Sequence, residues 1–379
     1  MAAIRVLQIF TVMDRGGAES MIMNYYRAMD RSKIQFDFLV HRSSQGAFDE
    51  EIKQLGGTIY KMPPINPLKP KPYYNKLRQF FKEHASYAIV HSHLNTFSCF
   101  PLKVAEECNI PCRIAHAHIA IEPLKLSDFL PHNEGFKESL KKIIKLQLKK
   151  RIHQHATHFF SCGEKAGLWL FGHQTKFTII NNAIDAQRFA LNETIRKNYQ
   201  EDFNIKNQLV IGHVGRFSSQ KNHSYLLKIF KEVTKINHKA VLILIGDGPL
   251  RPKIEQEAKE LDIYEKIRFL GVRTDIPELY QLLDVFVFPS FYEGLPVTLV
   301  EAQAAGLKVF ASNTITREVA LSPDIEYLSI NEAPRTWATA ICSKTPVKKT
   351  NNFQLIKEKG YDIYKNTEIL SKFYTKQLS

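Results

Sequence analysis

Two glutamates in the segment 288–306, FPSFYEGLPVTLVEAQAAG, have the residue type and the spacing of ligand-binding carboxylates. Glu293 follows an apolar run that ends at Phe288, and Glu301 comes eight residues later. The apolar run predicts a buried parallel strand, and Pro296 suits the first turn of a helix that would carry Glu301. Because a strand, a loop and a helix in this order place the helix N-terminus at the carboxyl end of a sheet, we expect a site for a phosphorylated ligand.

A second segment supplies positive charge. A strand expected at 209–214 runs into Gly215 and Arg216, and Lys221 follows five residues after Arg216. Arginine can donate two hydrogen bonds to one phosphate group and lysine adds a point charge, so the pair suits a diphosphate. Such a pair is more often plain surface charge when it stands alone. The two glutamates expected on the same sheet edge favour the functional interpretation.

Two His-x-His pairs, His91 with His93 and His116 with His118, stand at the ends of expected strands. Strand geometry points both imidazoles of each pair to one face of the sheet. Imidazoles are common zinc ligands, but histidines at strand ends more often have polar roles without a metal. We therefore expect no metal site here.

Composition indicates a folded, soluble protein of about two domains. The chain has 379 residues, of which 44% are hydrophobic and 24% charged. We expect no secretory segment, because the first residues form only a short strand-like run, and no apolar run approaches the ~20 residues of a membrane span. Among the five cysteines only Cys108 and Cys112 are close in sequence. That pattern predicts reduced thiols in a cytoplasmic protein.

The net charge of +14 points to an acidic partner. Nucleic acid, anionic lipid and phosphorylated small molecules all fit such a charge, but no zinc-finger or RNA-recognition pattern is present, so we expect no nucleic acid. Much of the charge lies in 137–152, where basic residues alternate with apolar residues at helical spacing. Two interpretations stay open: a surface helix packed by one stripe on the core, or a basic amphipathic helix on an anionic membrane surface.

Alternating strand and helix patterns must position these residues. They predict an α/β fold of two doubly wound, Rossmann-like domains that face each other across a cleft. We expect an N-terminal acceptor-binding domain at 1–185, a donor-binding domain at 186–360, and a C-terminal helix at 361–379 that packs back on the first domain. A polar connector is expected at 190–207 and a loop without clear period at 119–136. Expected strands lie at 4–10, 36–40, 58–61, 88–91, 113–117, 158–162, 176–180, 209–214, 240–245, 267–269, 284–288 and 309–311. Expected helices lie at 19–29, 48–55, 73–84, 101–108, 224–236, 249–261, 277–283 and 353–374.

Several short motifs together resemble a known family. In the second half they are Gly215-Arg with Gln220-Lys-Asn222, Gly246-Asp-Gly-Pro249, Phe269-Leu-Gly271, and Glu293-Gly-Leu-Pro followed by Glu301-Ala. Looser matches in the first half are Gly16-Gly17-Ala-Glu19, His91-Ser-His93, Arg113 to His118, and Asn182-Ala-Ile-Asp185. The pattern resembles the retaining GT-B glycosyltransferases of family 4 over nearly the whole chain. It is most similar to bacterial capsular and exopolysaccharide transferases.

The resemblance implies a role for each charged residue of the second half. Arg216 and Lys221 would hold the donor diphosphate and stabilise charge as the nucleoside diphosphate leaves. Glu301 would accept hydrogen bonds from the ribose hydroxyls, and Glu293 would contact the donor sugar. The helix N-terminus would cap the phosphates through backbone amides of Gly294, Leu295, Val297 and Thr298.

The same resemblance implies roles for residues elsewhere. His118 would lie near the reacting face of the sugar, with His116 as the competing choice. The catalytic set would thus be Glu293, His118, Arg216 and Lys221. Four further residues would lie close to the donor: Gly16, Gly17, Gly271 and Arg273.

The implied reaction moves a hexosyl unit from a nucleoside-diphosphate sugar, expected to be a UDP-sugar, to a lipid-linked saccharide. The resemblance implies retention of configuration. The sequence contains no Asp-x-Asp signature, and cations are available for the diphosphate, so we expect neither a metal nor another cofactor. We expect a cytoplasmic enzyme of surface polysaccharide biosynthesis that is peripheral on the plasma membrane. A nucleotide-sugar epimerase and a non-catalytic sugar-nucleotide-binding protein are the alternatives.

Overall fold

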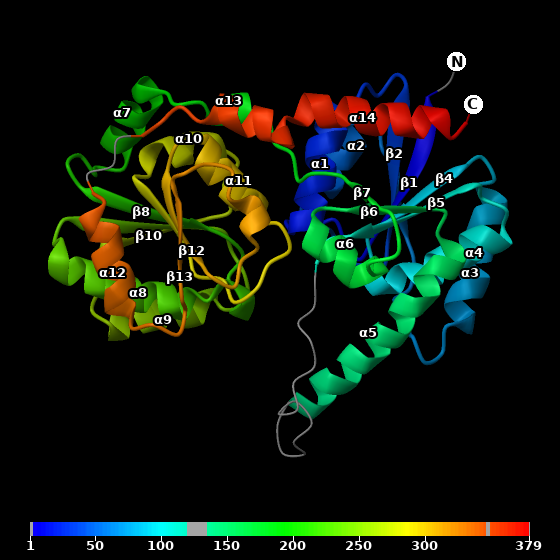
Figure 1. The fold of residues 1–379 in the computed structure, drawn as a ribbon, viewed down its shortest axis with the longest axis horizontal. Helices are drawn as coiled ribbons and strands as arrows, with labels where there is room; N and C mark the ends of the chain where they lie inside the picture. The colour runs from blue at the N-terminus through cyan, green and yellow to red at the C-terminus, as the bar shows by residue number, and fades with distance from the viewer. Residues whose placement is uncertain (1–2, 120–134, 346–348, 379) are drawn as a thin grey trace. The chain divides into compact units, whose positions relative to one another are not determined.

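Two parallel β-sheets, each covered by helices, make up the chain (Figure 1). The computed structural model describes residues 3–119, 135–345 and 349–378, with side chains from 143 onward in the helix that begins at 135. Its contacts divide into one unit of Met1–Asn182 with Ile363–Ser379 and a second unit of Ala183–Asp362. The domain limits expected from sequence were 185 and 360. The predicted α/β class with two parallel sheets is confirmed.

The N-terminal unit contains a seven-stranded sheet in the order β3-β2-β1-β4-β5-β6-β7. Every neighbouring pair is parallel, so the carboxyl ends of these strands share one edge. Helix α14 packs against α1, and α4 packs against α3 and α5. The strands are β1 (Ile4–Phe10), β2 (Ile34–Val40), β3 (Ile59–Lys61), β4 (Ile89–Ser92), β5 (Cys112–Ala117), β6 (His158–Ser161) and β7 (Thr178–Ile179). The helices are α1 (Gly17–Ala28), α2 (Asp49–Gln54), α3 (Lys71–Glu83), η1 (Asn95–Ser98), α4 (Cys99–Glu107), α5 (Gly135–His155), α6 (Glu164–Phe171) and α14 (Ile363–Lys376).

The second unit contains a six-stranded sheet in the order β10-β9-β8-β11-β12-β13. The strand order reverses between β8 and β11, which makes their carboxyl ends the switch point where α/β sheets bind ligands. The strands are β8 (Leu209–Val214), β9 (Ala240–Ile245), β10 (Ile267–Gly271), β11 (Val285–Phe288), β12 (Lys308–Ser312) and β13 (Ile325–Leu328). The helices are η3 (Ala186–Phe189), α7 (Glu193–Asp202), η4 (Ser219–Lys221), α8 (His223–Ile236), α9 (Arg251–Glu260), η5 (Tyr264–Lys266), α10 (Ile276–Leu282), α11 (Val297–Ala304), η6 (Arg317–Val319), α12 (Pro334–Ser343), α13 (Phe353–Ile356) and the π-turn η7 (Lys357–Tyr361).

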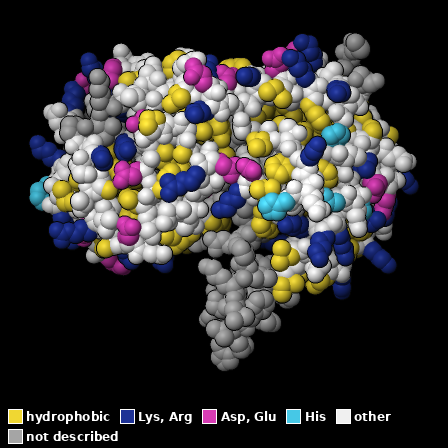
Figure 2. Space-filling model, viewed as in Figure 1, with side chains coloured by type: hydrophobic (Ala, Val, Ile, Leu, Met, Phe, Trp, Pro, Cys, Tyr) yellow, Lys and Arg dark blue, Asp and Glu magenta, His cyan; other side chains and the backbone are white. Residues whose placement is uncertain are grey.

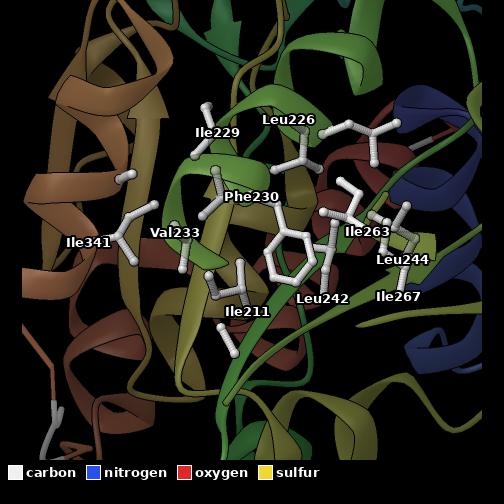
Figure 3. Packing of buried hydrophobic residues seen from close by; sticks show 14 of the residues in the cluster. Ile211, Leu226, Ile229, Phe230, Val233, Leu242, Leu244, Ile263, Ile267 and Ile341 are labelled. Carbon is white, nitrogen blue, oxygen red and sulfur yellow. The ribbon is translucent and has the colours of Figure 1, made fainter. Parts of the chain in front are cut away.

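The core of the second unit explains why its strands are continuously apolar. All six residues of β9, AVLILI, are buried, because helices cover both faces of the sheet. Phe230 from α8 lies among residues of the strands, with Ile211 and Leu242 beside it (Figure 3). Burial of such side chains contributes about 1.5–3 kcal/mol each. This packing holds the strand ends in place and so fixes the positions at which the following loops begin.

Three expectations about local structure are wrong. The stretch 190–207 is not a plain connector, because it contains α7, whose N-terminus is capped by the Asn192 side chain through the amides of Thr194 and Ile195. The helix expected at 353–374 is interrupted at Gly360, which has φ of +89°. The sequence patterns also missed α6, β13 and α12.

Two further expectations concern the chain as a whole. No helix in the described ranges has the length and apolar character needed to cross a membrane. None of the five cysteines, all of which lie in the described ranges, forms a disulfide. The loop expected at 119–136 falls almost entirely outside the described residues.

Candidate functional site

The carboxyl edge of the second sheet brings the two sequence motifs together. Strand β8 leads into Gly215 and Arg216, and the neighbouring strand β11 leads into the loop 289–296. Two hydrogen bonds join the segments that follow: Phe291 N–H donates to the Gln220 carbonyl at 2.9 Å, and Asn222 Nδ2 donates to the Pro289 carbonyl at 3.2 Å. The sheet therefore places the cationic loop against the loop that carries Glu293.

Lys221 and Glu293 form an ion pair at this edge. Lys221 Nζ lies 2.7 Å from Glu293 Oε1, and the two side chains are only 16% and 9% exposed. Gln220 Nε2 donates to the other oxygen, Oε2, at 3.0 Å and to the Tyr292 carbonyl at 2.9 Å. Lys221 Nζ also lies 4.6 Å from the centre of the Phe288 ring, a cation–π contact. Sequence reasoning assigned no role to Gln220, although its place beside Lys221 in the Gln220-Lys-Asn222 motif was a usable signal.

Glu301 lies inside the helix that starts at the same edge. Helix α11 begins at Val297 with Pro296 as its N-cap, close to the predicted start. The Tyr280 hydroxyl lies 3.2 Å from Glu301 Oε2 and 3.1 Å from the Thr298 carbonyl. Burial raises the pKa of Glu301 to about 7, while the Tyr280 hydroxyl and the charge of Arg188 act in the lowering direction. Neither Tyr280 nor Arg188 had been singled out from sequence.

Two buried hydroxyls, one in the loop before α11 and one in its first turn, lack hydrogen-bond partners among the described residues. Leu295 and Val297 are buried, so their contribution to a ligand would come from backbone amides. The buried hydroxyls of Ser290 and Thr298 make no hydrogen bond within the described part of the chain. Buried polar atoms in native proteins nearly always have a partner, which here a ligand or a water molecule can supply.

Gly271 and Arg273 lie at the end of β10 in the same unit. Gly271 has φ of +66°, and its carbonyl accepts from Gly246 N–H at 2.8 Å. Arg273 forms an ion pair with Asp275, Nη2 to Oδ2 at 2.6 Å. The backbone around Gly271 is thus fixed, and the Arg273 guanidinium is oriented by Asp275.

Gly16 and Gly17 open α1 in the N-terminal unit. Gly16 is the N-cap, and a Cβ atom there would lie 2.2 Å from Glu19 Oε2. A Cβ at Gly17 would meet nothing within 4 Å. In the described structure, the helix N-terminus at Gly17 therefore has room for a group beside it.

His118 follows β5 at the same edge of the N-terminal sheet. It is partly exposed, whereas His116 is fully buried. His118 Nε2 lies 2.8 Å from His93 Nδ1, and His116 Nδ1 lies 3.0 Å from His91 Nε2. The four rings therefore form two hydrogen-bonded pairs, which sequence spacing alone had not shown. Burial lowers the pKa of His118 to about 3, so this ring is neutral at physiological pH.

Three of these histidines lie close enough together to be candidate ligands of one metal ion. One ring nitrogen from each of His91, His93 and His116 lies within 4.8 Å of the others. Within this trio, His91 Nε2 lies 3.0 Å from His116 Nδ1, which is the range of a hydrogen bond, whereas His93 Nδ1 pairs with His118 Nε2 at 2.8 Å. The absence of a metal here stays a prediction, and the contacts themselves form two hydrogen-bonded pairs of imidazoles.

Comparison with known proteins identifies the family. Residues 195–340 match the family described as glycosyl transferases group 1, and residues 15–188 match Glycosyltransferase Family 4. EpsF of Bacillus subtilis, described as a glycosyltransferase, is 36% identical over 98% of this chain and 96% of its own length. The chain belongs to the group 1/family 4 glycosyltransferases. Another similar protein of this kind is CapH of Staphylococcus aureus, a capsular polysaccharide biosynthesis glycosyltransferase, 25% identical over 98% of each chain.

Solved structures confirm the fold of this glycosyltransferase as GT-B. HepE from Anabaena, solved with UDP, has a TM-score of 0.75 and 18% identity and covers 98% of this chain and 100% of its own. WaaG, a glycosyltransferase of lipopolysaccharide biosynthesis, has a TM-score of 0.68 at 17% identity, with coverage of 99% and 100%. The similarity to capsular and exopolysaccharide enzymes places this glycosyltransferase in polysaccharide biosynthesis, as predicted.

Proposed function

We propose that this glycosyltransferase transfers a hexosyl unit from a UDP-sugar to a lipid-linked saccharide with retention of configuration. The observation that carries the proposal is the Lys221–Glu293 pair beside the N-terminus of α11, with Glu301 on that same helix. The cation and the helix N-terminal amides suit the diphosphate of a sugar nucleotide, and the carboxylate suits its hydroxyls.

Relatives support the donor and the acceptor. An Escherichia coli relative named UDP-Gal:alpha-D-GlcNAc-diphosphoundecaprenol alpha-1,3-galactosyltransferase is 27% identical over 60% of this chain and 58% of its own length. HepE has also been solved with UDP-glucose, and that structure has a TM-score of 0.78 to this chain. A UDP-hexose donor and a diphosphate-linked lipid acceptor follow for this chain by analogy.

The ion pair leaves Lys221 able to bind phosphate. An ammonium group has three N–H donors, and the contact with Glu293 uses one of them. Glu293, whose other oxygen is held by Gln220, orients the lysine and keeps a lone pair for a sugar hydroxyl. Arg216 adds a second cation where β8 ends. Together the two cations replace the charge of a divalent ion, so transfer needs no metal.

In this proposal, the anomeric configuration is retained because the acceptor attacks the anomeric carbon on the face from which UDP leaves. The acceptor oxygen bonds to the anomeric carbon as the bond from that carbon to the UDP oxygen breaks. The acceptor proton passes to the departing diphosphate, whose negative charge Lys221 and Arg216 stabilise. Glu293 contacts the sugar, and the role proposed for His118 is to accept a hydrogen bond from a substrate hydroxyl.

A panel of nucleoside-diphosphate sugars tests this function. We expect UDP-sugars to raise the melting temperature and one of them to be consumed with a lipid-linked saccharide, with EDTA present throughout. The anomeric coupling constant of the product, measured by proton NMR, reports the configuration. An inverted anomer would contradict retention, and loss of turnover in EDTA would contradict metal independence. An epimerised sugar nucleotide would indicate an epimerase, and binding without turnover a non-catalytic protein.

We also propose that the outer face of α5 contacts an anionic membrane. The inner stripe of this helix packs on the protein, since Leu148 and Ile152 are buried. Ile143 and Leu146 remain 37% and 40% exposed. Figure 2 shows hydrophobic and basic side chains next to each other over the described part of α5. Both interpretations of the sequence thus have support, each on a different face of one helix.

Replacement of Lys145, Lys150 and Arg151 by glutamine is expected to weaken binding to phosphatidylserine vesicles at least about tenfold, at ~1 kcal/mol per charge. Cosedimentation at low and at physiological salt measures the effect. The matched control removes three lysines of the second unit, Lys228, Lys235 and Lys239, and should bind as the wild type does. Equal binding by both triple variants would reduce α5 to a packed surface helix.

A further inference from the structure

A network of buried polar side chains lies against the C-terminal helix in the N-terminal unit. Its members are Gln8 on β1, His91 and His93 at the end of β4, His116 and His118 at the end of β5, and Tyr374 on α14. Gln8 and His91 are register partners on neighbouring strands, so their side chains emerge on the same face. Gln8, His91, His116 and Tyr374 are fully buried, and His93 is 4% exposed. Of these residues, only His118 has a role in the proposed transfer reaction.

Burial keeps the imidazoles neutral. It lowers the pKa of His91, His93 and His116 well below the ordinary value, with smaller contributions from the neighbouring histidines. A neutral imidazole has one N–H donor and one bare nitrogen acceptor. In a hydrogen-bonded chain of neutral rings, the tautomer of one ring therefore determines the tautomer of the next.

The first chain runs from Gln8 to His118. Gln8 Oε1 lies 2.8 Å from His93 Nε2, and a carbonyl oxygen can only accept, so His93 carries its proton on Nε2. His93 Nδ1 is then the bare nitrogen. His118 Nε2, 2.8 Å away, must donate to it, which leaves Nδ1 of His118 as a lone-pair acceptor. The Phe10 ring stacks on His93 at 4.2 Å between centroids and holds its plane.

The second chain starts at the other end of the same amide. Gln8 Nε2 donates to the Tyr374 hydroxyl at 3.4 Å, and the hydroxyl directs its single hydrogen to its other neighbour, His91 Nδ1, 2.7 Å away, in the arrangement that satisfies both groups. His91 Nε2 then donates to His116 Nδ1 at 3.0 Å, so His116 carries its proton on Nε2. That nitrogen has no hydrogen-bond partner among the described residues. The second chain thus ends in the interior, whereas the first ends at the partly exposed His118.

We propose that Gln8 is a positioning residue that sets the tautomer of His118 through His93 and so presents Nδ1 of His118 as a hydrogen-bond acceptor. Reversal of the Gln8 amide would reverse both chains and turn Nδ1 of His118 into a donor. A bare nitrogen can accept the hydrogen of a sugar or acceptor hydroxyl; an N–H cannot. The contact with a hydroxyl rests on the proposed function, whereas the tautomer does not.

Nitrogen NMR of the full-length protein labelled with 15N-histidine tests the tautomer directly. The bare and protonated nitrogens of a neutral imidazole have well-separated shifts, and His118→Asn assigns the signals. We expect His118 to be protonated on Nε2 in the wild type. In Gln8→Met, which keeps the side-chain length and loses the amide, both tautomers should be populated.

The kinetic readout is the separate effect on kcat and KM. Gln8→Met should lower kcat for transfer about tenfold with KM for the donor within about twofold, since one hydrogen bond to the transition state is worth roughly this factor. Tyr374→Phe is the matched control, because it removes a hydroxyl from the second chain and keeps the Gln8 carbonyl. It should leave the His118 tautomer unchanged and kcat within about twofold of the wild type.

Each outcome separates the tautomer from the catalytic role. A wild-type His118 protonated on Nδ1, or a tautomer unchanged in Gln8→Met, would overturn the assignment of Gln8 even if transfer is observed. An equal change of the His118 tautomer population in Tyr374→Phe would mean that the packing of α14 sets the tautomer, and it would also overturn the assignment of Gln8. One equivalent of zinc in the purified protein, lost in His91→Asn, would replace the network by a metal site. If the His118 tautomer changes as expected but no sugar nucleotide is turned over, the proposed function is wrong and the role of Gln8 in setting the tautomer is still supported.

Discussion

Lys221→Met is expected to reduce transfer from the donor sugar at least about a hundredfold, because removal of one preorganised charge at a developing anion costs roughly 3 kcal/mol. The loss should fall mainly on kcat, since the charge of the diphosphate grows as the bond to the sugar breaks. Steady-state kinetics with saturating acceptor measure it. Arg216→Ala should show a loss of the same order by the same reasoning.

The ion pair demands a control for stability. Lys221→Met leaves the Glu293 carboxylate largely buried without its cation, which by itself destabilises the local structure. The double variant Lys221→Met with Glu293→Gln removes that stranded charge. It should recover the melting temperature and not the activity. Lys308→Met, at a similarly buried lysine that pairs with Glu326, should keep full transfer. If Lys221→Met retains wild-type kcat, the diphosphate assignment is wrong.

Glu301→Gln is expected to weaken UDP binding about 10- to 100-fold at pH 8, because a hydrogen bond to an ionised carboxylate is worth about 1.5–3 kcal/mol. Ribose hydroxyls donate to the carboxylate, so UDP binds the ionised form, and the affinity of the wild type should rise as pH rises through about 7. Calorimetry in buffers of different ionisation enthalpy should detect the proton that is released. The variant should show neither the proton release nor the rise in affinity with pH.

The raised pKa of Glu301 also makes the unfolding free energy fall as pH rises. The pKa of Glu301 is raised from 4.5 in the unfolded chain to about 7, so the native state binds the proton more tightly. Its contribution to stability is present below pH 4.5 and is lost as pH rises through 7. The unfolding free energy of the wild type should therefore fall from pH 5 to pH 8 by about 1–3 kcal/mol more than that of Glu301→Gln. Glu232→Gln, a control on α8, should follow the wild type; if Glu301→Gln does so too, Glu301 is not the titrating group.

Local patterns predicted much of the fold. Mostly apolar runs located β1, β8, β9 and β11 nearly to the residue, because strands covered on both faces have few polar positions. Polar or interrupted segments were predicted poorly. Helix α7 has no buried residue and is defined by its Asn192 cap and its packing on α10, so its apolar period is weak. The break at Gly360 depends on a left-handed backbone that composition does not reveal.

Residue types and spacing by themselves determined the family, the two parallel sheets and the sheet edge at which Glu293, Glu301, Arg216 and Lys221 would lie. The family follows from the resemblance of the motifs, and the sheets and the edge follow from local propensity and from the rule that parallel strands end at one edge. Only the tertiary structure decided how the side chains pair: Lys221 with Glu293, Tyr280 with Glu301, and Gln8 with His93 across 85 residues. Such pairs depend on the register of neighbouring strands and on the burial that sets protonation. Both are properties of the packed protein and leave no periodic signal in its sequence.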